Sequence, residues 1–277
     1  MRRHFLDRKR KTHVDRSSYE GVELVHWNPR RRRIEIPGLR RVPVAARINN
    51  FGDLLGPLIS RALAPAGRSA SVGRRLVSVG SIMHFARTGD TIWGTGINDK
   101  IDAAHLAFED LDVRAVRGPR TRERLQERGI FVPEVYGDPA LLLPELMPQL
   151  REWANKKQFP ETIIPNLNDF PAYKGESNVF SPVAPLKDVL KRIAQSEFVT
   201  GSSLHGIVIA ESLGIPARLI SSAHEPEFKY QDYFLGSGRE SQDFAASIDE
   251  ARAMGGHPSL AWDPAPLRDA FPSDLWN

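Results

Sequence analysis

The chain has 277 residues, of which 41% are hydrophobic and none is cysteine. This length suffices for one large or two modest hydrophobic cores, because domains usually span about 100–200 residues. The absence of cysteine excludes disulfides, thiolate metal sites and cysteine nucleophiles. No stretch approaches the roughly 20 consecutive apolar residues of a membrane helix, and the charged N-terminus lacks the apolar run of a secretion signal. We therefore expect a globular, cytoplasmic protein.

The charge is distributed unevenly along the chain. Residues 1–50 contain 14 Lys and Arg against 5 Asp and Glu, whereas the remainder contains 24 against 29. We interpret residues 1–41 as a basic N-terminal arm, which is either a solvated tail or a peripheral contact for an anionic membrane surface. Nucleic acid is not expected as a partner, because aromatic residues do not alternate with these arginines and no zinc, helix-turn-helix or RNA-binding pattern accompanies them.

Short runs rich in Val and Ile alternate with helical patterns, which is typical of parallel α/β units. The first series predicts, in chain order, strand 42–48, helix 53–63, strands 75–79, 91–93 and 113–117, and helix 119–128. Pro119 suits the first turn of that last helix, and Gly129 suits the position just after its end.

A proline-rich stretch at 139–185 interrupts the alternation and indicates a crossover between two lobes. We place an N-terminal α/β lobe at 42–177 and a C-terminal α/β lobe at 178–277. The second lobe holds the clearest unit of the sequence, with strand 198–200, helix 204–213 and strand 217–220. Ligands of open α/β sheets bind where strand C-termini meet helix N-termini, so we expect a site at this junction.

His205 lies in the first turn of the helix predicted at 204–213, where free backbone N–H groups and the helix dipole favour an anion. This position suits an acid–base histidine, although a single histidine is more often structural. The turn before it contains Ser202 and Ser203, whose hydroxyls and amides are suited to a phosphate group.

Arg117 and Arg120 flank a glycine turn between a predicted strand and a predicted helix. Guanidinium groups bind carboxylates and phosphates in a forked geometry. A solvated helix start is the alternative interpretation, but cations beside a helix N-terminus are unfavourable unless an anion binds there. We therefore expect these arginines, Arg117 above all, to bind an anionic substrate.

Asp53 follows Asn50 and Gly52 at the start of the helix predicted at 53–63. Helix capping alone explains an aspartate there. As a functional residue, Asp53 would accept a proton from a sugar hydroxyl or orient that hydroxyl. Thr95 and Asp138 lie in two further glycine-containing loops at strand ends, and we expect them to line the same cleft.

Neither a metal nor a nucleotide cofactor is expected. No histidines and carboxylates share a convincing metal-ligand spacing, and the sequence contains no Walker-type loop. The glycines at 94 and 96 are not followed by the third glycine of a dinucleotide fingerprint.

Taken together and in order, these segments resemble the polysaccharide pyruvyltransferase family, especially its shorter members in bacterial exopolysaccharide synthesis. The resemblance covers about residues 49–238. The matching stretches are NFGD at 50–53, VGSI at 79–82, IWGTG at 92–96, VRGPRT at 116–121, GDPA at 137–140, SLHG at 203–206, GIP at 214–216 and KYQDYF at 229–234.

The resemblance implies two Rossmann-like lobes in a GT-B-like arrangement, with the active site in the cleft between them. It also implies transfer of pyruvate from phosphoenolpyruvate to a sugar of a polysaccharide or glycolipid precursor, free or lipid-linked, to form a pyruvate ketal. In that chemistry His205 would be the acid, Asp53 the base or hydroxyl orienter, and Arg117 the clamp for carboxylate or phosphate. Lys229 and Ser203 would support them.

One departure from the family pattern affects the donor site. Some relatives carry an arginine near the histidine, where this chain has Ser202 and Ser203. A donor contact is then expected from Arg120 or Lys229 instead.

Two other functions fit part of the pattern. A GT-B glycosyltransferase with a nucleotide-sugar donor would also use small polar residues at a helix start, with Glu211 available to bind a ribose. A degenerate family member acting as a scaffold is the third hypothesis, against which the presence of Asp53, Arg117 and His205 argues.

Overall fold

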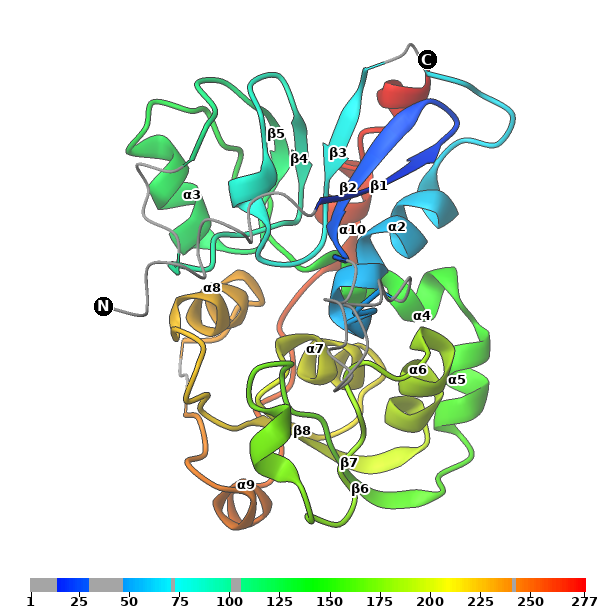
Figure 1. Cartoon of the computed structure of the whole chain (residues 1–277), viewed down its shortest axis with the longest axis vertical. Helices are drawn as coiled ribbons and strands as arrows, with labels where there is room; N and C mark the ends of the chain where they lie inside the picture. The colour runs from blue at the N-terminus through cyan, green and yellow to red at the C-terminus, as the bar shows by residue number, and fades with distance from the viewer. Residues whose placement is uncertain (1–13, 30–46, 71–72, 101–105, 241–242) are drawn as a thin grey trace, which may run out of the picture.

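The computed structural model describes residues 14–29, 47–70, 73–100, 106–240 and 243–277. Two separate sheets organise these residues, one in the upper half and one in the lower half of Figure 1. Most strand pairs in both sheets are parallel, which confirms the predicted α/β class. The predicted GT-B-like arrangement and the lobe boundary between residues 177 and 178 stay predictions.

The five-stranded sheet has the order β1-β2-β3-β4-β5. Its strands are β1 (Val14–Tyr19), β2 (Val22–Trp27), β3 (Arg75–Val77), β4 (Thr91–Trp93) and β5 (Asp112–Ala115). Strands β1 and β2 form an antiparallel hairpin, and the other pairs are parallel. Glu20 and Gly21 both have positive φ, which gives the hairpin a two-residue turn that matches the twist of its strands.

The three-stranded sheet is fully parallel and has the order β6-β7-β8. It comprises β6 (Phe159–Ile163), β7 (Ser196–Gly201) and β8 (Ala217–Leu219). Helix α6 (Leu186–Ala194) connects β6 to β7, and helix α7 (Leu204–Ser212) connects β7 to β8. Because β6 pairs with β7, the residues of this sheet begin before residue 178, where the second lobe was predicted to start.

Helices cover and connect the two sheets (Figure 1). The α-helices not yet introduced are α2 (Phe51–Leu63), α3 (Pro119–Gln126), α4 (Leu143–Leu146), α5 (Gln149–Ala154), α8 (Phe228–Gly236), α9 (Ile248–Met254) and α10 (Pro264–Asp269). The short 3-10 turns are η1 (Met83–Phe85), η3 (Pro139–Leu142), η4 (Phe170–Tyr173) and η5 (Ser273–Trp276). None of the helices in the described ranges is long and apolar enough to cross a membrane.

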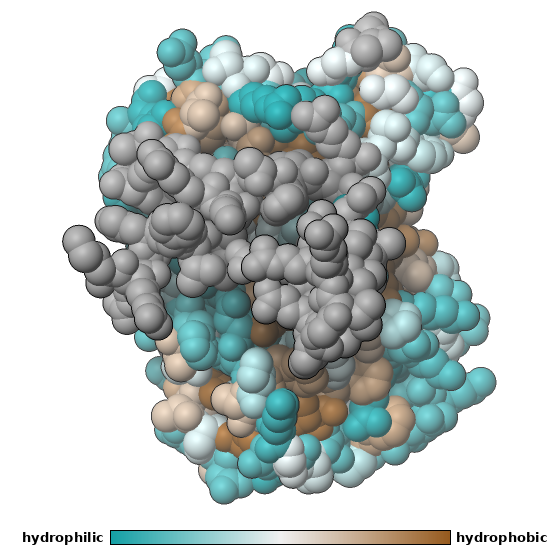
Figure 2. Space-filling view, in the orientation of Figure 1, coloured by the Kyte–Doolittle hydropathy of each residue, from teal (hydrophilic) through white to brown (hydrophobic). Residues whose placement is uncertain are grey.

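A single large hydrophobic cluster joins the two sheets. Leu24 of β2, Leu55 of α2 and Ala140 of η3 belong to the same cluster of buried side chains as Val199 of β7 and Ile207 of α7. Figure 2 shows hydrophilic residues over much of the visible rim, with hydrophobic residues in the lower half of the view. The interior, rather than a solvated linker, therefore connects the two halves.

The C-terminal segment returns to the five-stranded sheet, as the red trace beside β3 in Figure 1 shows. The indole Nε1 of Trp93 donates to the Leu267 carbonyl at 2.9 Å, and Nε1 of Trp276 donates to the Tyr19 carbonyl at 3.1 Å. Arg114 forms an ion pair with Asp274 at 2.9 Å. These contacts fasten the end of the chain to the sheet with which it began.

Most of the elements predicted from sequence are present with small shifts of their ends. The strand at 91–93 has the predicted bounds, and the unit β7-α7-β8 follows the predicted order. The strand predicted at 42–48 lies outside the described residues except for 47–48, and residues 1–13 and 30–41 of the proposed basic arm also lie outside them. The hairpin of β1 and β2 was not predicted, because residues 1–41 were interpreted from their charge as an arm. Strand β6 was not predicted either, because it lies in the proline-rich stretch that was interpreted as a crossover.

Candidate active site

The N-termini of α2 and α7 meet at a glycine. A Cβ atom added to Gly52 would lie only 2.4 Å from Nδ1 of His205, far inside van der Waals contact. Any side chain at this position would therefore displace the imidazole. The predicted site residues Gly52 and His205, which are 153 positions apart, are brought together by this contact.

His205 faces a buried carboxylate. Its Nε2 lies 3.4 Å from Oδ2 of Asp138, whose side chain is fully buried, whereas 14% of the histidine side chain is exposed. The other oxygen of Asp138, Oδ1, accepts a hydrogen bond from the Ala140 amide at 3.0 Å and caps η3. The carboxylate is thus fixed by the turn and is placed to balance the charge of an imidazolium.

The facing atoms of this pair lack hydrogen bonds. Among the described residues, Asp138 Oδ2 and His205 Nε2 are two of only three buried side-chain N or O atoms without a hydrogen-bond partner. The 3.4 Å separation satisfies an ion pair but not the stricter geometry of a hydrogen bond. Buried polar atoms are rarely left in this state, because each unsatisfied group costs about 1–3 kcal/mol. Such a cost is typical of groups kept for chemistry.

Asp53 lies in the first turn of α2, beside this pair. Burial raises the pKa of the Asp53 carboxyl, while the Asn50 amide and the charges of His205 and Lys229 partly oppose that rise. Nδ2 of Asn50 donates to Oδ2 of Asp53 at 2.5 Å. The N-cap of the helix is Asn50, not Asp53, so the capping interpretation does not account for the aspartate.

Lys229 approaches the same region from α8. Its Nζ pairs with Oε2 of Glu225 at 2.8 Å, and Lys100 donates to the other oxygen of Glu225. Burial lowers the pKa of Lys229, and the Glu225 carboxylate opposes that decrease. The charge of Lys229 lowers the pKa of Asp53, and the charge of Arg117 lowers the pKa of Lys229. The ammonium of Lys229 therefore lies within electrostatic range of both residues.

Arg117 is fully buried and its guanidinium is already engaged. Nε and Nη2 contact Oδ2 of Asp232 at 3.0 and 2.9 Å, Nη1 donates to Ser81 at 2.6 Å, and Nη2 also donates to the Ile97 carbonyl. Asp232 in turn accepts from the amide and hydroxyl of Thr121. This network joins α3 to α8, and the role of Arg117 as a donor clamp stays a prediction.

The remaining predicted residues have defined partners. Ser203 caps α7, with its hydroxyl accepting from the Gly206 amide, and the buried hydroxyl of Ser202 accepts from the Asn166 amide at 3.1 Å. Thr95 donates to the Gly80 carbonyl at 2.8 Å. Arg120 donates to Gln231 and lines a hollow of about 500 Å³ between α3 and α8.

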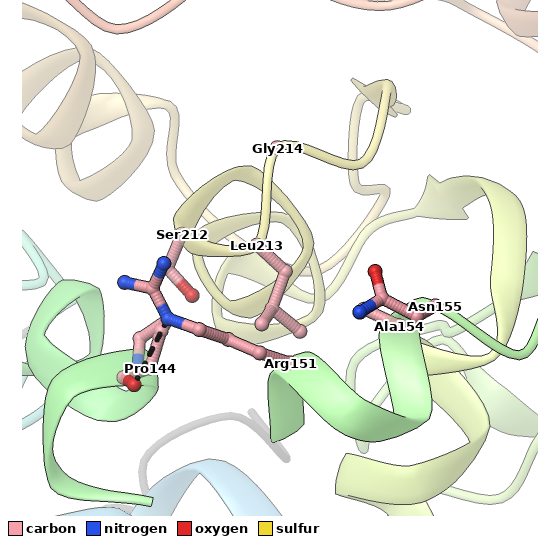
Figure 3. Close-up of a pocket in the computed structure, with 7 residues that line it drawn as sticks. All are labelled: Pro144, Arg151, Ala154, Asn155, Ser212, Leu213 and Gly214. Carbon is pink, nitrogen blue, oxygen red and sulfur yellow. Dashed lines mark hydrogen bonds between the residues drawn. The ribbon is translucent and has the colours of Figure 1, made fainter. Parts of the chain in front are cut away.

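Another hollow, of about 450 Å³, lies at the opposite end of α7 from His205. Figure 3 shows Arg151 beside Ser212 and Leu213, with its Nε donating to the Pro144 carbonyl at 3.2 Å. Helix C-termini carry partial negative charge, so this end of α7 does not favour an anion. The hollow is therefore a poor candidate for a phosphate site.

Sequence reasoning missed several charged or polar residues around the site. Asp232 lies in the matching stretch KYQDYF at 229–234 but was given no role there. Glu225, Asn166, Asp169 and His224 were not predicted as functional, because they belong to none of the matching stretches. No group of three or more potential metal-ligating side chains occurs in the part of the chain that the structure describes.

Comparison with known proteins supports the resemblance seen in the sequence. The family described as polysaccharide pyruvyl transferase matches residues 50–224. The chain is 27% identical over 199 residues to the succinoglycan biosynthesis protein ExoV of Rhizobium meliloti (strain 1021), a region spanning 66% of this chain and 60% of that protein. No solved structure matches the chain.

Proposed function

Because the chain belongs to the polysaccharide pyruvyl transferase family, we propose that it transfers pyruvate from phosphoenolpyruvate to two hydroxyls of one sugar, forming a ketal. The family makes the protein a transferase, and the donor and acceptor are the proposal. The acceptor would be a sugar of a polysaccharide or glycolipid precursor, lipid-linked precursors included, at the cytoplasmic face of the membrane. The relative ExoV is named for the synthesis of one such polysaccharide.

The observation that carries this proposal is the buried pair of His205 and Asp138 beside the carboxyl of Asp53. Ketal formation starts when the methylene carbon of the donor takes a proton and a sugar oxygen bonds to the neighbouring carbon. This step needs an acid and a base in one place. His205, balanced by Asp138, supplies the acid, and Asp53 accepts the proton of the attacking hydroxyl.

Binding of the donor needs fixed positive charge, since phosphoenolpyruvate carries a carboxylate and a phosphate. The N-terminal amides of α7 and the turn at Ser202 and Ser203 adjoin the histidine, and Lys229 lies within electrostatic range of Asp53, so these groups suit the donor. Arg117 adds its charge from within its network with Asp232, and Arg120 of α3 donates to Gln231 of α8. Asn50, Gly52 and Thr95 would line the same site, with Gly52 against the imidazole of His205, and the active site would lie between the two lobes.

The alternative nucleotide-sugar transferase receives less support. Glu211, the carboxylate assigned to a ribose in that hypothesis, pairs with Arg239 at 2.5 Å and accepts from the Tyr233 hydroxyl at 2.6 Å. Both of its oxygens are engaged inside the fold, so binding a ribose would break a buried ion pair.

The test is incubation of the protein with phosphoenolpyruvate and a panel of sugar acceptors, without nucleotide and with excess chelator. We expect one phosphate released for each ketal formed, detected by phosphate assay and mass spectrometry. His205→Ala protein purified in parallel controls for contaminating activity. Glycosyl transfer from a nucleotide sugar without ketal formation would overturn the proposal.

A further inference from the structure

A second histidine and carboxylate pair lies at the carboxyl ends of the three-stranded sheet. Asp169 follows β6, Ser202 follows β7, and Ser222 and His224 follow β8. The carboxyl ends of parallel strands share one edge of a sheet, which is where α/β proteins bind ligands. The proposed chemistry has not yet used this pair.

Asp169 is held as a charged carboxylate. Its Oδ2 accepts from Asn166 at 2.6 Å and from the Ser222 hydroxyl at 2.7 Å, and Oδ1 lies 2.5 Å from Nδ1 of His224. Burial alone would raise the pKa of Asp169, but hydrogen bonds, including those from Ser202, Ser222 and His224, hold it below its ordinary value. An ionised carboxylate only accepts, so Nδ1 of His224 carries the proton.

This arrangement leaves the opposite nitrogen of His224 as a base. A neutral imidazole with its proton on Nδ1 has a lone pair on Nε2. The histidine side chain is 56% exposed, whereas that of Asp169 is 7% exposed, so a buried anchor orients an accessible ring. The same logic governs histidines that move protons in hydrolytic triads.

The pair is connected to the candidate active site through two short segments. Ser202 Oγ bonds to Asn166, which also contacts Asp169, and Ser202 precedes His205 by three residues. Glu225 directly follows His224 and pairs with Lys229, whose charge reaches Asp53. Both histidines therefore border the same edge of the sheet.

Ketal formation requires two proton transfers. In the first, a hydroxyl proton is lost as the methylene carbon gains one, which leaves a phosphate-bearing adduct. In the second, the bond from carbon to the phosphate oxygen breaks, a second sugar oxygen bonds to that carbon, and its proton must reach the departing phosphate. The proposed function assigns His205 and Asp53 to the first transfer, which leaves the second transfer open to another group.

We propose that His224, oriented by Asp169, performs the second transfer, with Nε2 taking the proton of the second hydroxyl and delivering it to the leaving phosphate. This proposal rests on the proposed function. In this scheme the mostly buried pair of His205 and Asp138 serves the first proton transfer, and the more exposed pair of His224 and Asp169 serves the second.

The test is a single turnover of His224→Ala with enzyme in excess over phosphoenolpyruvate and acceptor. We expect donor consumption at about the wild-type rate, phosphate release slowed by ~10²-fold or more, and a phosphate-bearing adduct in quenched samples analysed by mass spectrometry. Added imidazole should restore phosphate release, because the exposed site admits it. Asp169→Asn should show the same defect more weakly.

Ser221→Ala is the matched control, since Ser221 is exposed and adjoins Ser222. It should behave as wild type in every step. Phosphate release by folded His224→Ala at the wild-type rate would overturn the inference. So would a variant that no longer consumes the donor, accumulates no adduct and is not rescued by imidazole. If wild-type protein forms no ketal, the proposed function fails instead, and the two failures are distinguishable.

Discussion

Two buried carboxylates, those of Asp232 and Asp138, each face the side chain of a residue distant in sequence, but their hydrogen bonding differs. Asp232 accepts from Arg117 and from both the amide and hydroxyl of Thr121. Asp138 uses one oxygen to cap a turn and turns the other toward His205 without a hydrogen bond.

This contrast separates two uses of buried charge. A carboxylate whose oxygens are satisfied is costly to disturb and holds α3 against α8, whereas one with a free oxygen is positioned for a partner that changes during a reaction. Burial alone, which is complete for both aspartates, does not distinguish them. The state of hydrogen bonding does, and each prediction below tests that distinction.

The largest expected effect is on turnover. His205→Ala should lower kcat by ~10²–10⁴-fold, the range for a positioned general acid, while phosphoenolpyruvate still binds. Steady-state kinetics and donor titration by calorimetry check this pair of outcomes. A variant with near wild-type kcat would show that the histidine is structural, and the Asp138 pair would then not differ in role from the Asp232 pair.

The next effect is on folding. Asp232→Ala should destabilise the protein by ~3–5 kcal/mol, because it leaves the Arg117 charge buried and unpaired. Thermal unfolding should shift down by roughly 10 °C. The double variant Arg117→Met with Asp232→Leu should recover much of the loss. An unchanged melting temperature combined with a raised donor KM would instead identify Arg117 as the predicted clamp.

The matching change at the other pair should act in the opposite way. Asp138→Asn keeps Oδ1 as an acceptor for the Ala140 amide but removes the charge facing His205. We expect kcat to fall by ~10–100-fold, with donor affinity retained and the melting temperature within about 2 °C of wild type. A parallel loss of stability and turnover would show that Asp138 supports the fold as Asp232 does.

The smallest expected effect on stability concerns Asp53, whose pKa is raised by burial. A carboxyl with a raised pKa in the folded state favours its protonated form, so its contribution to stability is lost as pH rises through that pKa. Asp53→Asn should therefore melt ~1–3 °C higher at neutral pH, yet be nearly inactive.

The same residue also predicts a pH profile. In wild type, kcat/KM should decline as pH falls through the raised pKa of Asp53, because the protonated carboxyl no longer accepts the hydroxyl proton. This acidic limb should be absent from the residual activity of Asp53→Asn. A limb of unchanged position in the variant would assign it to another group.

Local pattern predicted the elements that carry the site better than it predicted their contacts. The helix beginning at 51 and the unit β7-α7-β8 were readable because turn residues and apolar periodicity are local. The hairpin of β1 and β2 was missed because dense charge surrounds the buried run Val22–Trp27.

The pairs that define the site were beyond local pattern. Asp138 and His205 are 67 positions apart, and Arg117 and Asp232 are 115 apart, so no spacing rule relates them. Both members of the first pair were predicted to line the cleft, but not to face each other. His224 and Asp169 lie in loops whose sequence gave no reason to join them, because only the order of the sheet brings their strand ends together.

The hydrophobic cluster that joins both sheets limits how far the two halves of the molecule can move apart. Two bodies that share an interior cannot rock apart on a hinge without exposing apolar surface, at roughly 25 cal/mol for each Å². Under the proposed function, a bulky acceptor would then reach the site through small movements of surface segments. The conformational entropy of the site is then lost mainly during folding, and little more is lost each time a substrate binds.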